Sequence, residues 1–105
     1  MIESLFNVIK NGDIISAREK ISKIDVNVFD EHGKTPLHYA VEYDFKYIVK
    51  LLLEHGADPF QVDLLENKPP YVYAKSDIMR VLLKRSFIKN YNDNHDASTV
   101  AVLKT

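Results

Sequence analysis

Parts of this chain repeat each other at a fixed distance, and this repetition limits the folds that the chain can adopt. Asp30 recurs as Asp63 and Pro36 as Pro69, both at a spacing of 33 residues. A period of this length is typical of stacked units, each of which buries its apolar face against its neighbours. We therefore interpret the 105 residues as one domain of four units: 1–29, 30–62, 63–92 and 93–105.

Each unit is predicted to hold a turn and two short helices. In the second unit, Gly33 gives the turn a permissive backbone and Thr35 can cap the first helix. Pro36 suits the first position of that helix, where a backbone N–H would have no partner within the helix. Asp44 is expected to cap the second helix, and Gly56 to end it in a left-handed turn. Helical spacing predicts these buried faces: Leu37, Ala40 and Val41; Ile48, Leu51 and Leu52; and, in the first unit, Ile14, Ala17, Ile21 and Ile24.

The third unit is shorter than the second. Ile78 matches Ile48 at a spacing of only 30, so three residues are missing between its helices. With this deletion, the fourth unit is expected to begin at Asp93, which lies 63 residues after Asp30. Only the first helix of that unit would be present. Its apolar residues could cap the stack or allow self-association at a C-terminal edge; they are Val100, Val102 and Leu103.

The first helix of the third unit departs from the pattern of the second. Lys68 replaces the capping threonine, and Tyr71 replaces the histidine of the second unit. Pro70 directly after Pro69 disfavours helical backbone angles at Pro69. We expect a helix that starts late and ends near Lys75, which indicates either decay of the repeat or a reshaped contact surface.

The stretches "GKTPLHYA" and "IVKLLLEHGAD" resemble the ankyrin repeat, whose pattern residues 30–62 carry in full. The resemblance implies an all-α ankyrin-repeat solenoid of helix-turn-helix units joined by short turns or hairpins. The first unit would be an N-terminal capping repeat, the third a shortened repeat, and the last part of a C-terminal capping repeat. The resemblance also implies that the Thr35 side chain pairs with the His38 ring, whose other nitrogen forms a hydrogen bond with the backbone of the adjacent turn. The residues with structural roles are Gly33, Thr35, Pro36, Leu37, His38, Ala40 and Gly56.

Thr35 and His38 also raise the alternative of a catalytic site. A hydrolase needs an orienting carboxylate and an oxyanion hole as well, whereas a hydroxyl at a helix start is occupied by the free N–H groups of that helix. The repeated Asp30, Asp63 and Asp93 would lie about 10 Å apart along the stack, too far for a catalytic pair, and we expect their side chains to form turns. His32 and His95 occupy the same position two units apart and would lie about 20 Å from each other, so we expect no metal site. We predict no enzyme, no cofactor and no metal.

Charge and composition favour a protein partner inside a cell. Lys plus Arg number 14 and Asp plus Glu 15, so no overall charge attracts nucleic acid. Arg80, Lys84 and Arg85 form a local basic cluster, which we interpret as a solvated helix face. The chain has no cysteine, and we expect neither a signal peptide nor a membrane-spanning segment. The predicted location is the cytoplasm, or a host cell into which the chain is delivered.

The concave side of a solenoid is its usual contact surface. Tyr43 and Phe45 place aromatic rings where the ankyrin pattern usually has Gly-His, and Leu64 and Leu65 form an apolar pair on a turn. These leucines either contact a partner or fold back on the next turn. The predicted protein-binding residues are Glu31, His32, Lys34, Glu42, Tyr43, Phe45, Leu64, Leu65 and Asn67.

Carboxylates surround this predicted surface and would suit a partner with basic rim residues. They are Asp30, Glu31, Glu42, Asp44, Asp63 and Glu66. The sequence therefore predicts a non-catalytic protein-interaction module. The alternative is a dedicated inhibitor or immunity protein that blocks the active site of a toxin or enzyme.

Overall fold

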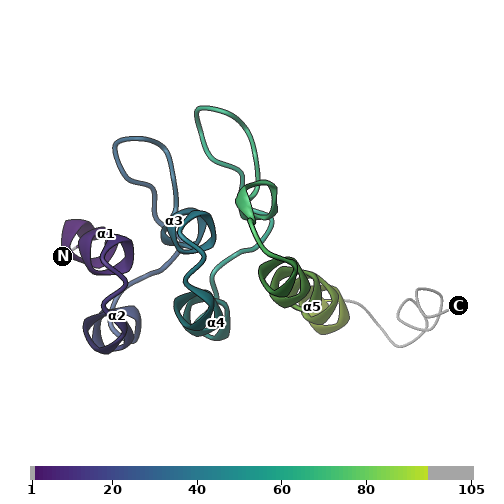
Figure 1. The fold of residues 1–105 in the computed structure, drawn as a ribbon, viewed down its shortest axis with the longest axis horizontal. Coiled ribbons are helices and arrows are strands. Elements are labelled where there is room, and N and C mark those ends of the chain that lie inside the picture. Colours follow the sequence, from purple (N-terminus) through teal and green to yellow (C-terminus); the bar gives the residue numbers. More distant parts are fainter. Residues whose placement is uncertain (1, 95–105) are drawn as a thin grey trace, which may run out of the picture.

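The chain forms two rows of helices that stack along its length (Figure 1). The computed structural model describes residues 2–94. The inner row consists of α1 (Ile2–Lys10), α3 (Pro36–Glu42) and the 3-10 helix η1 (Pro70–Tyr73); the outer row consists of α2 (Ile14–Ile21), α4 (Lys46–Glu54) and α5 (Asp77–Asn94). Two loops project beyond the inner row. The predicted all-α solenoid is confirmed, and residues 2–94 contain no strand.

One apolar core continues from the first unit to the third. Helices of neighbouring units pack against each other within both rows, so each unit covers the apolar face of the next. Every α-helix contributes side chains that are at most 2% exposed: Leu5 and Ile9 in α1, Ala17 and Ile21 in α2, Leu37 and Val41 in α3, Ile48 and Leu52 in α4, and Met79 and Leu83 in α5.

The helix α2 differs from its prediction at both ends. Asp13 caps it, because its carboxylate accepts a hydrogen bond from the N–H of Ser16 at 3.1 Å. Ile14 directly follows this cap and is 44% exposed, so it does not belong to the buried face. The helix ends at Ile21, and Ile24 packs against the core from the loop that follows.

Asp44 does not cap α4, contrary to the prediction. Its backbone has a left-handed φ of 60°, and the N-cap residue is Phe45. An N-cap residue usually has an extended backbone, which Asp44 cannot have while it turns the chain out of α3. The Asp44 carboxylate instead accepts hydrogen bonds from Lys46 and from Ser76 of the third unit, both at 2.9 Å.

Gly56 ends α4 in the predicted left-handed turn. Its φ is 91°, and its N–H donates to the carbonyl of Leu53 at 3.2 Å. The N–H of Ala57 reaches back to the carbonyl of Leu52 at 2.9 Å, as expected where a glycine follows a helix.

The helix α5 continues through Asn94, so the unit boundary predicted after residue 92 falls inside it. The rest of the predicted fourth unit, including Val100, Val102 and Leu103, lies outside the described residues. The division into units therefore stays a prediction. Among residues 2–94, no helix combines the length and apolar character that crossing a membrane requires.

Candidate protein-binding surface

The two projecting loops begin with the same turn. We call residues 30–34 tip one and residues 63–68 tip two. A backbone hydrogen bond joins the first and last residue of each tip, at 3.0 Å in tip one and 2.9 Å in tip two. The first residue is an aspartate, Asp30 or Asp63, whose carboxylate accepts backbone N–H groups within the tip. These aspartates form turns as predicted, and tip two is one residue longer than tip one.

The longer tip shifts all later residues of the third unit by one position. The predicted matches of Lys68 with Thr35 and of Tyr71 with His38 are therefore wrong. The structure pairs residues 34 apart: Gly33 with Asn67, both at positive φ; Thr35 with Pro69, both N-caps; Pro36 with Pro70, both first helical residues; and Tyr39 with Tyr73.

The same shift continues into α5. Met79 is fully buried and takes the place of Ile48, whereas Ile78, the predicted match, is 61% exposed. Pro69 has an extended backbone, with φ of −75° and ψ of 164°, as its position before a proline requires. The expected helix is consequently only the short η1, which ends at Tyr73 and not near Lys75.

Thr35 and His38 have the structural roles that the resemblance implied. The His38 Nε2 lies 2.9 Å from the carbonyl of Lys68, and a carbonyl can only accept, so Nε2 carries the proton. The Thr35 hydroxyl therefore donates to Nδ1 at 2.8 Å. Burial lowers the pKa of His38, although the bond to the Lys68 carbonyl opposes this shift. Both ring nitrogens are occupied, which leaves none free to activate a nucleophile.

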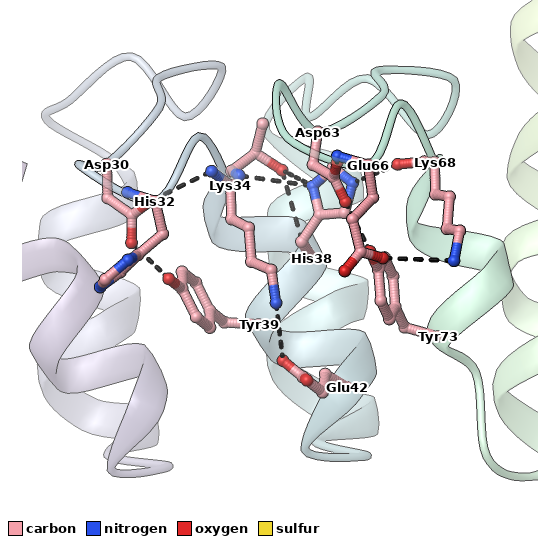
Figure 2. A network of polar contacts seen from close by, with 11 residues as sticks. Asp30, His32, Lys34, His38, Tyr39, Glu42, Asp63, Glu66, Lys68 and Tyr73 are labelled. Atoms are coloured by element: carbon pink, nitrogen blue, oxygen red, sulfur yellow. Dashed lines mark hydrogen bonds and ion pairs between the residues drawn. The ribbon is translucent and has the colours of Figure 1, made fainter.

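A tyrosine from the helix binds the aspartate of each tip (Figure 2). The hydroxyl of Tyr39 donates to Asp30, and that of Tyr73 donates to Asp63 at 2.5 Å. Burial and the bond to Asp30 raise the pKa of Tyr39, and the bond to Asp63 and burial raise that of Tyr73. Burial alone would raise the pKa of both aspartates, but the tyrosine and backbone hydrogen bonds lower it. Each pair thus consists of a neutral phenol and a carboxylate.

Tip two is fixed against tip one. The N–H of Leu64 donates to the carbonyl of Gly33 at 2.9 Å, and His38 binds the last residue of tip two as described above. Leu64 and Leu65 nevertheless remain 66% and 76% exposed. They do not fold back into the protein.

Two lysines approach the ring of Tyr39. The Nζ of Lys10 lies 4.5 Å from the ring centroid, and the Nζ of Lys34 lies 5.6 Å from it. Lys34 is also 5.2 Å from the ring centroid of Tyr73 and 3.6 Å from the carboxylate of Glu42 (Figure 2). Attraction between a cation and an aromatic face holds both ammonium groups on the inner row.

A groove of about 460 Å³ lies beside these lysines. It is bordered by α1, α3 and both tips, and its lining residues are Lys10, His32, Lys34, Tyr39, Glu42, Tyr43, Asp63, Leu65 and Glu66. The groove thus combines an apolar side chain from a tip, aromatic rings and charges of both signs.

The groove unites five of the predicted binding residues: His32, Lys34, Glu42, Tyr43 and Leu65. Glu31, Leu64 and Asn67 are exposed on the tips but do not line it. Phe45 is half-buried between the first two units. A Cβ atom on Gly12 would lie 3.0 Å from its ring, and the ring meets the Tyr43 ring at a centroid distance of 5.8 Å. We therefore leave Phe45 out of the binding surface.

Four residues that line the groove are not among the predicted binding residues: Lys10, Tyr39, Asp63 and Glu66. Lys10 could have been found, because it lies 33 residues before Tyr43 and the surface was predicted only for the second and third units. Tyr39 lies inside the ankyrin motif, where it was assigned no role. Glu66 is expected only in the charged rim, and Asp63 is expected in that rim and as a turn-forming residue.

That charged rim is largely neutralised within the chain. Glu42 and Glu66 pair with lysines, and Asp44 pairs with Lys46 and Ser76. Asp30 and Asp63 accept the tyrosine and backbone hydrogen bonds already described. Among the described residues, the only ion-pair contact of Glu31 is with His32, at 3.4 Å, and this contact is an ion pair only when the imidazole is protonated.

The histidines and carboxylates form no metal site in the described part of the chain. No group of three His, Asp or Glu side chains there is placed to hold a metal ion. Arg80 of the basic cluster pairs with Asp77 at 3.6 Å on α5, and neither residue lines the groove.

Comparison with known proteins places this geometry in a family. Residues 32–64 match the ankyrin repeat. A putative ankyrin repeat protein of fowlpox virus is 41% identical over 66 residues, which are 61% of this chain and 34% of that protein. The ankyrin repeat and LEM domain-containing protein 1 homolog of Caenorhabditis elegans is 41% identical over 68 residues, or 65% of this chain and 9% of its own length. Palmitoyltransferase AKR1 of Lachancea kluyveri is 49% identical over 55 residues, or 50% of this chain and 8% of the enzyme.

This chain thus spans about a third or less of the length of these relatives. What they share with it is the repeat region, and ankyrin repeats are generally non-catalytic modules for protein–protein interaction. The capped helix at Thr35, the bond from His38 to the next tip and the stacked helix pairs agree with that assignment. Residues 32–64 thus match an ankyrin repeat, and the chain is similar to ankyrin repeat proteins.

Proposed function

We propose that this chain is a non-catalytic module that binds a protein partner in the groove between its two tips. The observation that carries this proposal is the exposed apolar pair on tip two. Leu65 is 76% exposed and lines the groove, and Leu64 beside it is 66% exposed. Covering these side chains would remove apolar surface from water, which favours association.

The backbone around the groove supports tight binding because it is already ordered. Tip two is bonded to tip one through Leu64 and to α3 through His38, and each tip is bonded to a tyrosine of the inner row. A surface that is fixed before binding loses less conformational entropy when the partner arrives. The partner would meet Tyr43 and Leu65 as apolar anchors, with polar groups of both tips around them.

The test is capture of the native partner by the tagged chain and by Leu65→Glu. A carboxylate at this position would be buried against the partner, so recovery should fall at least about tenfold. Ile15→Glu is the matched control, because Ile15 is 84% exposed on α2 and does not line the groove. Circular dichroism should show both variants folded. Equal recovery of the partner by both variants would contradict the proposed surface.

A further inference from the structure

The charged residues that line the groove are not equally available to a partner. Glu42 already pairs with Lys34 at 3.6 Å, and Glu66 pairs with Lys68 at 3.2 Å. Each of these carboxylates has a positive charge of this chain beside it. Neither offers an uncompensated negative charge to a partner in the groove.

Asp63 carries a negative charge that a partner cannot reach. Its side chain is 1% exposed. One carboxylate oxygen accepts the hydroxyl of Tyr73 at 2.5 Å, and the other accepts the N–H of Glu66 at 2.6 Å. This carboxylate therefore maintains tip two and is not part of the contact surface.

Lys10 differs from these groups. It lies in the last turn of α1, lines the groove, and forms no ion pair with the carboxylates whose side chains the structure describes. Its ammonium group is held 4.5 Å from the ring centroid of Tyr39, where the aromatic face fixes its position without neutralising it. Lys34 approaches the same ring at 5.6 Å and adds a second, partly compensated positive charge.

We propose that the groove binds a partner segment in which an aspartate or glutamate side chain pairs with Lys10 and an adjacent apolar side chain contacts Leu65 and Tyr43. The inference rests on the proposed function and deepens it. It also reverses the charge expected from the sequence, because the carboxylates that line the groove are occupied within the chain. The groove is about 460 Å³ in volume, which suits one or two side chains of an extended segment.

Three blocked peptides that differ at one residue test the charge preference. They are acetyl-Leu-Asp-Leu-amide, acetyl-Leu-Asn-Leu-amide and acetyl-Leu-Lys-Leu-amide, titrated into the isotope-labelled full chain and followed by amide chemical shifts. The aspartate peptide should shift the amides of Lys10, Tyr39, Tyr43 and Leu65. It should bind about threefold to tenfold more tightly than the asparagine peptide at low salt, and this advantage should shrink at 0.3 M salt.

Variants of Lys10 assign the effect to one side chain. Lys10→Gln should remove the advantage of the aspartate peptide over the asparagine peptide, and Lys10→Arg should retain it. Lys50→Gln is the matched control, because Lys50 is exposed on α4 and does not line the groove. It should leave all three affinities unchanged.

The outcomes separate this inference from the proposed function. Equal binding of the three peptides in the groove would overturn the preference for an acid while leaving the binding surface in place. Tighter binding of the lysine peptide than of the aspartate peptide would also overturn the preference for an acid. The same holds if none of the three peptides changes the amide chemical shifts of the groove residues. The proposed function fails on a different result, which is capture of the native partner by Leu65→Glu as efficiently as by the unmodified chain.

Discussion

Gly33 is the residue on which the contact between the two tips depends. Its φ is 72°, in the left-handed region, and its carbonyl accepts the N–H of Leu64. A Cβ atom at this position would lie 2.8 Å from the Leu64 Cβ and 3.3 Å from its backbone nitrogen. Only a residue without a side chain allows the tips to approach this closely.

Gly33→Ala should therefore destabilise the chain more than Gly12→Ala does. Gly12 has nearly the same φ, 69°, so both variants lose about 1 kcal/mol from the backbone conformation. At Gly12 the new methyl group would meet the edge of the Phe45 ring at 3.0 Å, and a ring can move. At Gly33 it meets tip two close to the backbone, which should add about 1–3 kcal/mol. Urea unfolding measures both values, and equal losses would show that the tips separate easily.

At the scale of the element, η1 depends on its contact with tip two. It is a single turn of four residues, and Tyr73 at its end binds a carboxylate that is almost fully buried. Tyr73→Phe should lower the free energy of unfolding by about 2 kcal/mol, because Asp63 loses a hydrogen bond and cannot replace it with water. The pKa of Asp63 should rise in this variant.

Tyr71→Phe is the control for this prediction. It removes the same hydroxyl from the same helix, but the structure shows no hydrogen bond from Tyr71 to a described residue. Unfolding in urea at pH 7 should therefore show little change for Tyr71→Phe. A similar loss in both variants would mean that the bond to Asp63 contributes nothing specific.

The third unit also shows where prediction from the sequence fails. The cap at Thr35, the turn at Asp30 and the pairing of Thr35 with His38 depend on neighbouring residues, so a local motif predicts them. One extra residue in tip two shifts the later helices, and the match of Asp30 with Asp63 gives no sign of it. The stretches "GKTPLHYA" and "NKPPYVYA" do match at a spacing of 34 and would have revealed it. The availability of Lys10 could not be predicted, because it depends on ion pairs formed by residues of other units.

At the scale of the whole molecule, each unit packs only against its neighbours, so the hydrogen bonds between units contribute directly to the stability of the stack. His38 connects the second unit with the third through the Lys68 carbonyl. This bond needs a proton on Nε2, while Nδ1 must stay unprotonated to accept from Thr35. A second proton on the buried ring would face the backbone N–H of Thr35, which donates to Nδ1 at 3.3 Å, and would place a charge in the core.

The stability of the stack should consequently fall as the pH is lowered from 7.5 to 5.5. Burial lowers the pKa of His38 in the folded chain below the value of about 6.5 that it has when unfolded. Well above pH 6.5 neither state binds the proton and the full stability is present; near and below that pH the unfolded state binds the proton first, so folding becomes less favourable. The aspartates of the tips, whose pKa is lowered, stay ionised throughout this range.

Urea unfolding of the unmodified chain and of His38→Gln at several pH values checks this assignment. The variant should be less stable at pH 7.5, because it loses the ring between Thr35 and Lys68. It should, however, lack the loss of stability at lower pH that protonation of His38 causes. It retains His32 and His55, which are exposed, so any decline that both proteins share belongs to other groups. An identical decline in the two proteins would show that protonation of His38 does not control the contact between the second and third units.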